Sequence, residues 1–142
     1  MSVKTTFAVI AVLASAFALV ACGSTPKRDV SAAGKKQANA VESIQEIDII
    51  RKDLLRVSNE VRQDRRKEAL NIASETYVQH FEKIEPVLAK VSPKLKQSIE
   101  TQFAGTLRKK LRSNAPKKEI FAFITALDAR IGQAQVQIKN LR

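Results

Sequence analysis

The sequence has few of the residues that build turns, disulfides and aromatic cores. Its 142 residues include no Trp, one Cys, one Tyr, four Gly and four Pro. A single cysteine cannot form a disulfide within the chain, so packing alone has to stabilise the fold. Because Gly and Pro supply most tight turns, their scarcity argues against a many-stranded sheet. Helix is the secondary structure that we expect.

The residues that common catalytic and metal sites need are scarce as well. The lone His80 has no second His, and the sequence contains no CxxC or HExxH spacing, no nucleophile elbow and no Gly-rich phosphate loop. We therefore expect a protein that is not an enzyme and that holds no metal or cofactor. For His80 we expect a structural role, at the surface or at the edge of the core.

Negative charge is in short supply, since 25 Lys and Arg face 14 Asp and Glu and leave a formal net charge of +11. An excess of this size attracts anionic surfaces. The basic residues gather in two clusters, which are the candidate anion-binding residues: Arg62, Arg65, Arg66 and Lys67, then Arg108, Lys109, Lys110, Arg112, Lys117 and Lys118. The alternative is that each cluster is an ordinary solvated face.

The longest apolar run lies at the start of the chain. Lys4 precedes about fifteen apolar or small residues, fewer than the roughly 20 that a membrane span needs. The run ends in Leu19-Val20-Ala21-Cys22, followed by the neutral Gly23-Ser24-Thr25. This pattern resembles the lipobox-type signal peptide of bacterial lipoprotein precursors, and the resemblance covers residues 1–22 only.

The resemblance implies a cleaved signal peptide, residues 1–21, with the cut between Ala21 and Cys22. Leu19, Val20 and Ala21 would form the lipobox, and Cys22 would carry a covalent lipid, including acyl chains such as palmitate, that anchors the protein to a membrane. Gly23 takes the place of the Asp that retains such proteins in the inner membrane of enterobacteria. We therefore expect the periplasmic face of the outer membrane, with the inner membrane and the cell surface as alternatives.

Residues 22–36 are polar and interrupted by Gly and Pro, so we expect the lipidated cysteine to be followed by a flexible linker. Residues 37–142 form the expected basic helical domain. Apolar residues recur there at steps of three and four, which marks one face of a helix. The stripes are Val41, Ile44, Ile47, Ile50, Leu54, Val57 and Val61; Leu70, Ala73, Tyr77, Phe81, Ile84 and Leu88; Leu95, Ile99, Phe103, Leu107 and Leu111; and Ile120, Ile124, Leu127, Ile131, Ala134, Ile138 and Leu141.

The first two stripes contain neither Gly nor Pro between Ala38 and Glu85, which favours one long helix that ends at Pro86. The open alternative is two helices that meet in a turn near Arg65. Ser92-Pro93 is a typical helix start, with the Ser hydroxyl as the cap. The last helix is expected to begin near Pro116. The predicted fold is all-α: a small antiparallel bundle of three helices, or four, with a long first helix whose apolar overhang would allow a homodimer.

We expect a non-catalytic structural or interaction module of the bacterial envelope. Its expected partners are the membrane, through the lipid, and an anionic component such as anionic lipid, lipopolysaccharide, peptidoglycan or an acidic envelope protein. Nucleic acid is disfavoured, because the chain carries an export signal and no aromatics lie among the basic clusters. The alternatives are a lipoprotein of a conjugation or secretion apparatus, an exclusion or immunity lipoprotein, and a ligand-binding or inhibitory module with a pocket among Phe81, Phe103, Phe121 and Phe123.

Overall fold

The computed structural model describes the backbone of residues 30–113 and 115–141, and side chains from Asn39 onward. Every regular element among these residues is a helix, so the all-α prediction is confirmed. The expected signal peptide, the lipobox and Cys22 lie outside the described residues. The elements are α1 (Val30–Arg62), α2 (Arg66–Thr76), the π-helical η1 (Tyr77–Phe81), α3 (Glu82–Val91), α4 (Pro93–Glu100), the π-helical η2 (Thr101–Leu107), α5 (Arg108–Arg112) and α6 (Lys117–Lys139).

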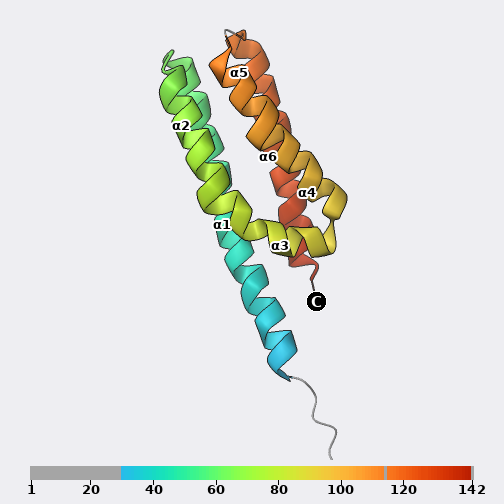
Figure 1. The fold of residues 1–142 in the computed structure, drawn as a ribbon. Helices are drawn as coiled ribbons and strands as arrows, with labels where there is room; N and C mark the ends of the chain where they lie inside the picture. Colours follow the sequence, from blue (N-terminus) through green and yellow to red (C-terminus); the bar gives the residue numbers. More distant parts are fainter. Residues whose placement is uncertain (1–29, 114, 142) are drawn as a thin grey trace, which may run out of the picture.

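These elements make four helices, because α2, η1 and α3 follow one another without a break, as do α4, η2 and α5. The helices run up, down, up and down, as Figure 1 shows. They form an antiparallel bundle, as the sequence predicted: α1 packs against α2 and α6, and α5 packs against α2. The chain enters α1 at the same end of the bundle at which α6 finishes, and α1 extends beyond the other helices at that end (Figure 1).

The expectation of one helix from Ala38 to Glu85 is wrong. The first helix ends at Arg62, and the second begins at Arg66 after a short turn in which Asp64 has a φ of 62°. Asp is one of the few residues that adopt this left-handed conformation readily, so the turn needs no Gly. Residues 62–68 contain no apolar side chain that could be buried if the helix continued. The alternative of two helices that meet near Arg65 is the one the structure has.

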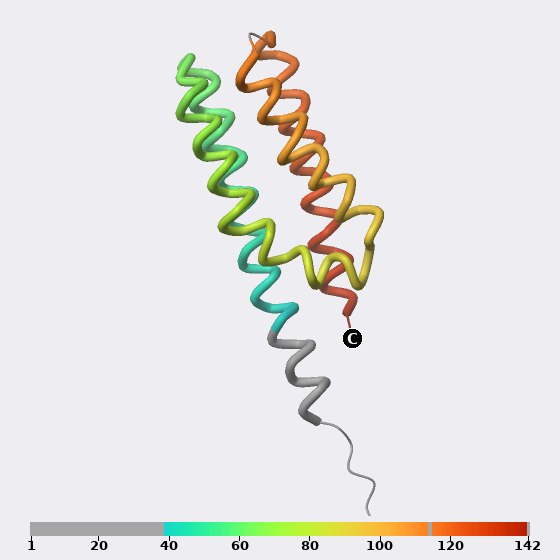
Figure 2. The backbone as a smooth tube through the Cα atoms, in the orientation of Figure 1, coloured from blue at the N-terminus to red at the C-terminus, as the bar shows by residue number. Residues whose placement is uncertain are grey.

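The expectation that Pro86 ends a helix is also wrong, because Pro86 lies inside α3, which continues to Val91. The wide π-helical turn η1 comes just before this segment, and π-turns and prolines are both common causes of helix bends. The helix bends there, so that α3 crosses from the α1–α2 pair to the start of α4 (Figure 2). Thus Pro86 accompanies a bend in the second helix and leaves the helix unbroken.

The predicted starts of the third and fourth helices are confirmed, and the first helix starts earlier than predicted. The third helix begins at Pro93 and the fourth follows Pro116, although the Ser92 hydroxyl makes no capping hydrogen bond. The start of α1 at Val30 falls within the expected linker, so residues 30–36 are helical. Ala and Lys, which form helices well, make up most of this stretch.

The four apolar stripes meet in one core. Most of their members are fully buried, among them Leu54, Phe103, Leu107 and Ile131. One member was placed wrongly, since Val41 is 53% exposed and Ala40 takes the buried position. From Ile47 to Val61 the stripe of α1 is covered by helices of the same chain. The homodimer stays a prediction.

Candidate anion-binding end of the bundle

Two turns that are distant in the sequence meet at one end of the bundle. The guanidinium of Arg66, in the first turn of α2, donates hydrogen bonds to the carbonyl oxygens of Ser113 (2.9 Å) and Ala115 (2.7 Å). The Nζ of Lys117 donates to the carbonyl oxygen of Arg62 (3.0 Å) and to the Asp64 carboxylate (2.7 Å). These bonds join the α1–α2 turn to the α5–α6 turn.

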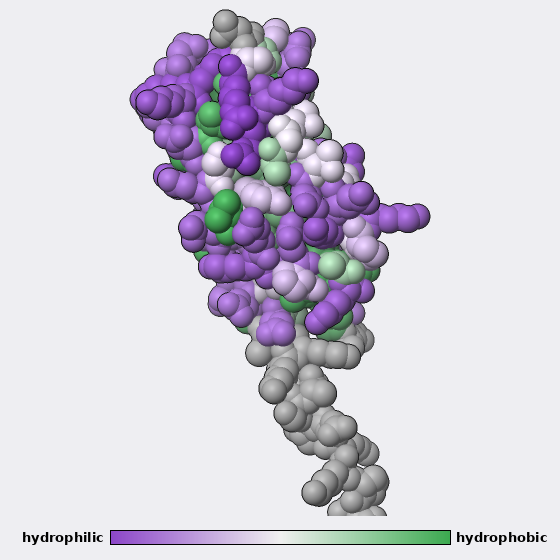
Figure 3. Space-filling model, in the orientation of Figure 1, coloured by the Kyte–Doolittle hydropathy of each residue, from purple (hydrophilic) through white to green (hydrophobic). Residues whose placement is uncertain are grey.

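The two basic clusters therefore form one surface. We call residues 60–68 and 108–119 the basic tip. It contains all ten candidate anion-binding residues and four carboxylates, those of Glu60, Asp64, Glu68 and Glu119. Figure 3 shows the most hydrophilic residues of this face gathered at the upper end, where the basic tip lies.

The charge of the described domain is polarised along its axis. The basic tip holds ten basic and four acidic residues, whereas the rest of residues 39–141 holds nine of each. The excess positive charge of this part of the chain thus belongs to the basic tip, and the body of the bundle is neutral overall. The tip lies at the end of α1 opposite to Val30, where the chain enters the helix (Figure 1).

Several tip cations have structural partners. The Arg65 guanidinium donates two hydrogen bonds to the Glu60 carboxylate, and this interaction lowers the pKa of Glu60. The Nζ of Lys110 lies 3.2 Å from a Glu119 oxygen. Arg62 donates to the Asn59 side chain (2.7 Å), and its guanidinium carbon lies 5.8 Å from the centre of the Phe121 ring. Together with Arg66 and Lys117, these residues hold the turns in place.

The remaining cations face solvent. Four exposed cations of the basic tip form no side-chain hydrogen bond or ion pair with the described residues: Lys67, Lys109, Arg112 and Lys118. Arg108 is half-buried, and its Nε finds no hydrogen-bond partner among the described residues. The four exposed cations are free to bind an anion.

Two helices begin and two end at the basic tip, so the positive and negative ends of their dipoles largely offset one another. Both α2 and α6 begin at the basic tip, and neither has a side-chain cap at its N-terminus. The N-terminus of a helix carries the positive end of the helix dipole, so cations in the first turn are repelled. Lys67 and Lys118 occupy such positions. The same first turns also hold Glu68 and Glu119, whose negative charge suits a helix N-terminus. The excess positive charge of the basic tip therefore comes from its side chains.

A second polar cluster lies farther from the tip, between α1 and the η1–α3 segment. The Glu46 carboxylate is 9% exposed and accepts hydrogen bonds from Lys83 (2.8 Å) and from His80 (2.5 Å). Burial raises the pKa of Glu46, but these bonds and the two neighbouring positive groups lower it more, so its pKa lies below the ordinary value. His80 is thus a bonded histidine at the edge of the core, as expected. No pattern in the sequence pointed to Glu46.

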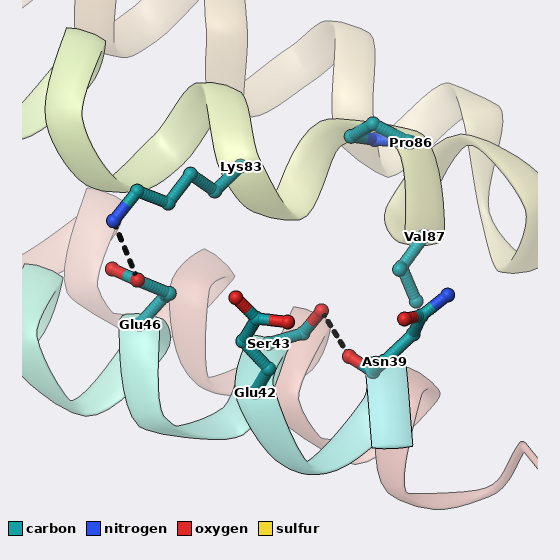
Figure 4. A pocket seen from close by; sticks show the side chains of 7 residues that line it. All are labelled: Asn39, Glu42, Ser43, Glu46, Lys83, Pro86 and Val87. Carbon is teal, nitrogen blue, oxygen red and sulfur yellow. Dashed lines mark hydrogen bonds and ion pairs between the residues drawn. The ribbon is translucent and has the colours of Figure 1, made fainter. Parts of the chain in front are cut away.

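A hollow of about 330 Å³ lies beside this cluster, lined by residues of α1 and α3 (Figure 4). Some of its polar groups bond to one another, since Lys83 donates to Glu46 and the Ser43 hydroxyl donates to the Asn39 carbonyl, while the Glu42 carboxylate makes no hydrogen bond to the described residues.

The pocket expected among four phenylalanines does not form. Phe81 and Phe103 are fully buried, with ring centroids 6.2 Å apart, and Tyr77 packs against both. Burial and nearby carboxylates raise the pKa of Tyr77. Phe121 lies at the basic tip beside Arg62, about 24 Å along α1 from the level of Glu46. The rings fill the core and do not gather around one cavity.

The described residues contain no group of three or more His, Cys, Asp and Glu side chains placed to hold a metal ion. In the same residues, no helix combines the length and the apolar character that crossing a membrane requires. Comparisons of the chain with protein-family models, with curated proteins and with solved structures found no match.

Proposed function

We propose that the protein is a non-catalytic lipoprotein of the bacterial envelope that binds an anionic envelope component through the basic tip. The observation that carries this proposal is the location of the excess positive charge, which lies in the basic tip while the rest of residues 39–141 is neutral overall. A charge excess spread evenly over the bundle would favour solubility alone. An excess confined to one end defines a surface for an anionic partner.

The anchor in this proposal is the lipid on Cys22, inferred from the lipobox-type signal, and the proposed location is the periplasmic face of the outer membrane. A lipid anchor confines the bundle to a layer next to the membrane and so raises the effective concentration of the basic tip near its partner. Weak contacts then suffice. Each exposed cation close to an anionic surface contributes up to about 1 kcal/mol.

In this proposal the four exposed cations of the basic tip make most of the contacts with the anionic partner. Arg65, Arg66, Lys110 and Lys117 already bond to groups of the chain, so their substitution would also loosen the turns. Substituting the exposed cations removes charge and leaves those bonds in place. This difference separates binding from folding in an experiment.

The test compares two variants that lose the same charge. The tip variant carries K67Q, K109Q, R112Q and K118Q, and the side variant carries K52Q, K90Q, K94Q and K139Q at exposed positions on the body of the bundle. Binding to soluble poly-L-glutamate is measured by calorimetry at low and high salt. We expect the tip variant to lose affinity by about 100-fold to 1,000-fold, because four contacts of up to about 1 kcal/mol each are removed. The side variant should stay within about threefold, and equal losses in both variants would contradict the proposal.

The anchor is tested separately. In the unmodified protein, mass spectrometry should find acyl groups on Cys22, and the protein should fractionate with membranes. Cys22→Ser should abolish both properties. Membrane fractionation that survives in the unacylated variant would contradict the lipid anchor while leaving the basic tip untouched.

A further inference from the structure

The point of anchorage and the basic tip are held apart by α1. This helix has 33 residues and is about 50 Å long, with Val30 at one end and the basic tip at the other. Cys22 lies eight residues before Val30, and eight residues span at most about 28 Å. Even if this segment ran straight back along α1, a lipid on Cys22 would remain roughly 20 Å short of the basic tip. When α1 stands away from the membrane, this separation exceeds the screening length of about 8–10 Å at physiological salt.

From this geometry we infer that the basic tip contacts a layer other than the membrane that holds the lipid, namely the carboxylate-bearing peptidoglycan, and that the protein bridges the two. The inference rests on the proposed function and specifies the partner of the same basic tip. The lipid would hold one end of the bundle, and the polymer would bind the other.

The sides of the bundle give it no reason to lie flat on its own membrane. Their charges balance, with nine basic and nine acidic residues outside the tip in residues 39–141. The large apolar residues exposed there are scattered over several helices: Val41, Ile49, Leu55, Val78 and Val136. Outside the basic tip, residues 39–141 therefore carry no net charge that would draw a side of the bundle to an anionic membrane.

The arrangement of the free cations suits a flexible polymer better than a flat surface. Lys67 extends from the start of α2, Lys109 and Arg112 from α5, and Lys118 from the start of α6. Lys109 also lies three residues, about 4.5 Å along the helix axis, before Arg112. A flat membrane surface contacts only the cations that face it, on one side of the bundle or at its very end. Polymer strands can pass around the end and bring carboxylates to all of them.

The experiment uses the lipidated protein, purified from membranes in detergent and reconstituted into fluorescent vesicles of neutral phosphatidylcholine. The vesicles are mixed with purified peptidoglycan sacculi, and the fluorescence that sediments with the sacculi is measured. We expect at least about tenfold more fluorescence in the pellet than with protein-free vesicles, and a decline as salt is added. The tip variant should abolish sedimentation and the side variant should preserve it, with circular dichroism confirming that both are folded.

Two further arms distinguish the sources of negative charge. Anionic phosphatidylglycerol in the same vesicles should leave capture by sacculi unchanged, and loss of capture would overturn the inference by showing that the tip reaches its own membrane. Vesicles that cluster with anionic vesicles but ignore sacculi would also overturn it. Failure of the proposed function looks different. In that case the protein does not bind poly-L-glutamate through the tip, or it carries no lipid and does not enter vesicles.

Discussion

At the scale of single residues, the most constrained group in the body of the bundle is the Glu46 carboxylate. It is nearly buried and accepts bonds from His80 and Lys83, so one acid on α1 fastens both η1 and α3. A buried carboxylate is costly unless it is paired and hydrogen-bonded, and this one is both. Its role is therefore to position the bent second helix against the first.

The substitution Glu46→Gln tests this role through its pH dependence. The pKa of Glu46 in the folded protein lies below the ordinary value of about 4.5, so the charged form stabilises the fold. This contribution is complete above about pH 4.5 and is lost as the pH falls through the folded pKa. We expect the variant to be about 1–3 kcal/mol less stable than the natural protein at neutral pH, with a difference that shrinks in acid.

Urea unfolding at several pH values measures this difference. Glu42→Gln is the matched control, because Glu42 lies one turn earlier on α1 and is exposed, and it should change stability by less than about 0.5 kcal/mol. A Glu46→Gln variant as stable as the natural protein at neutral pH would contradict the account, as would a difference that persists unchanged in acid.

At the scale of elements, the apolar stripes could be read directly from the sequence, because the helical period places nearly all the same residues in the core. The breaks between helices were harder to predict. The α1–α2 turn contains no Gly or Pro and depends on one Asp in a left-handed conformation, while Pro86 lies inside a bent helix. Both features depend on how the helices pack, which local sequence preferences do not contain.

The basic tip could not be predicted for the same reason. In one continuous first helix, Arg62 to Lys67 would lie along its middle, far from any turn. Once the chain reverses at Asp64, the up-down-up-down order brings the α5–α6 turn back to the same end. The sequence therefore supplied the residues of the candidate site, while their meeting depends on a single reversal.

Asp64 provides the test at this scale. Asp64→Asn keeps a residue that tolerates a positive φ and loses an exposed ion pair with Lys117, so it should cost less than about 1 kcal/mol. A β-branched side chain is strained in this conformation. We therefore expect Asp64→Val to lower the free energy of unfolding by about 1–2 kcal/mol more than Asp64→Asn does. Thermal unfolding of both variants measures the difference. Equal stabilities would show that the turn does not hold residue 64 in the left-handed region.

At the scale of the whole molecule, the bundle is electrically polarised. One end carries the excess positive charge of residues 39–141, and the other receives the chain that leads back to Cys22. Neighbouring cations repel one another, so this arrangement costs some stability at low salt. We expect salt to stabilise the natural protein more than the tip variant, in which four of the cations are gone.

The central claim is that negative charge binds at the basic tip, and an NMR titration of the isotope-labelled protein with poly-L-glutamate tests it most directly. The account predicts that amide signals of residues 60–68 and 108–119 shift, that residues 39–50 and 139–141 at the opposite end stay unchanged, and that added salt reverses the shifts. Shifts spread evenly over the bundle, or concentrated at the opposite end, would contradict it.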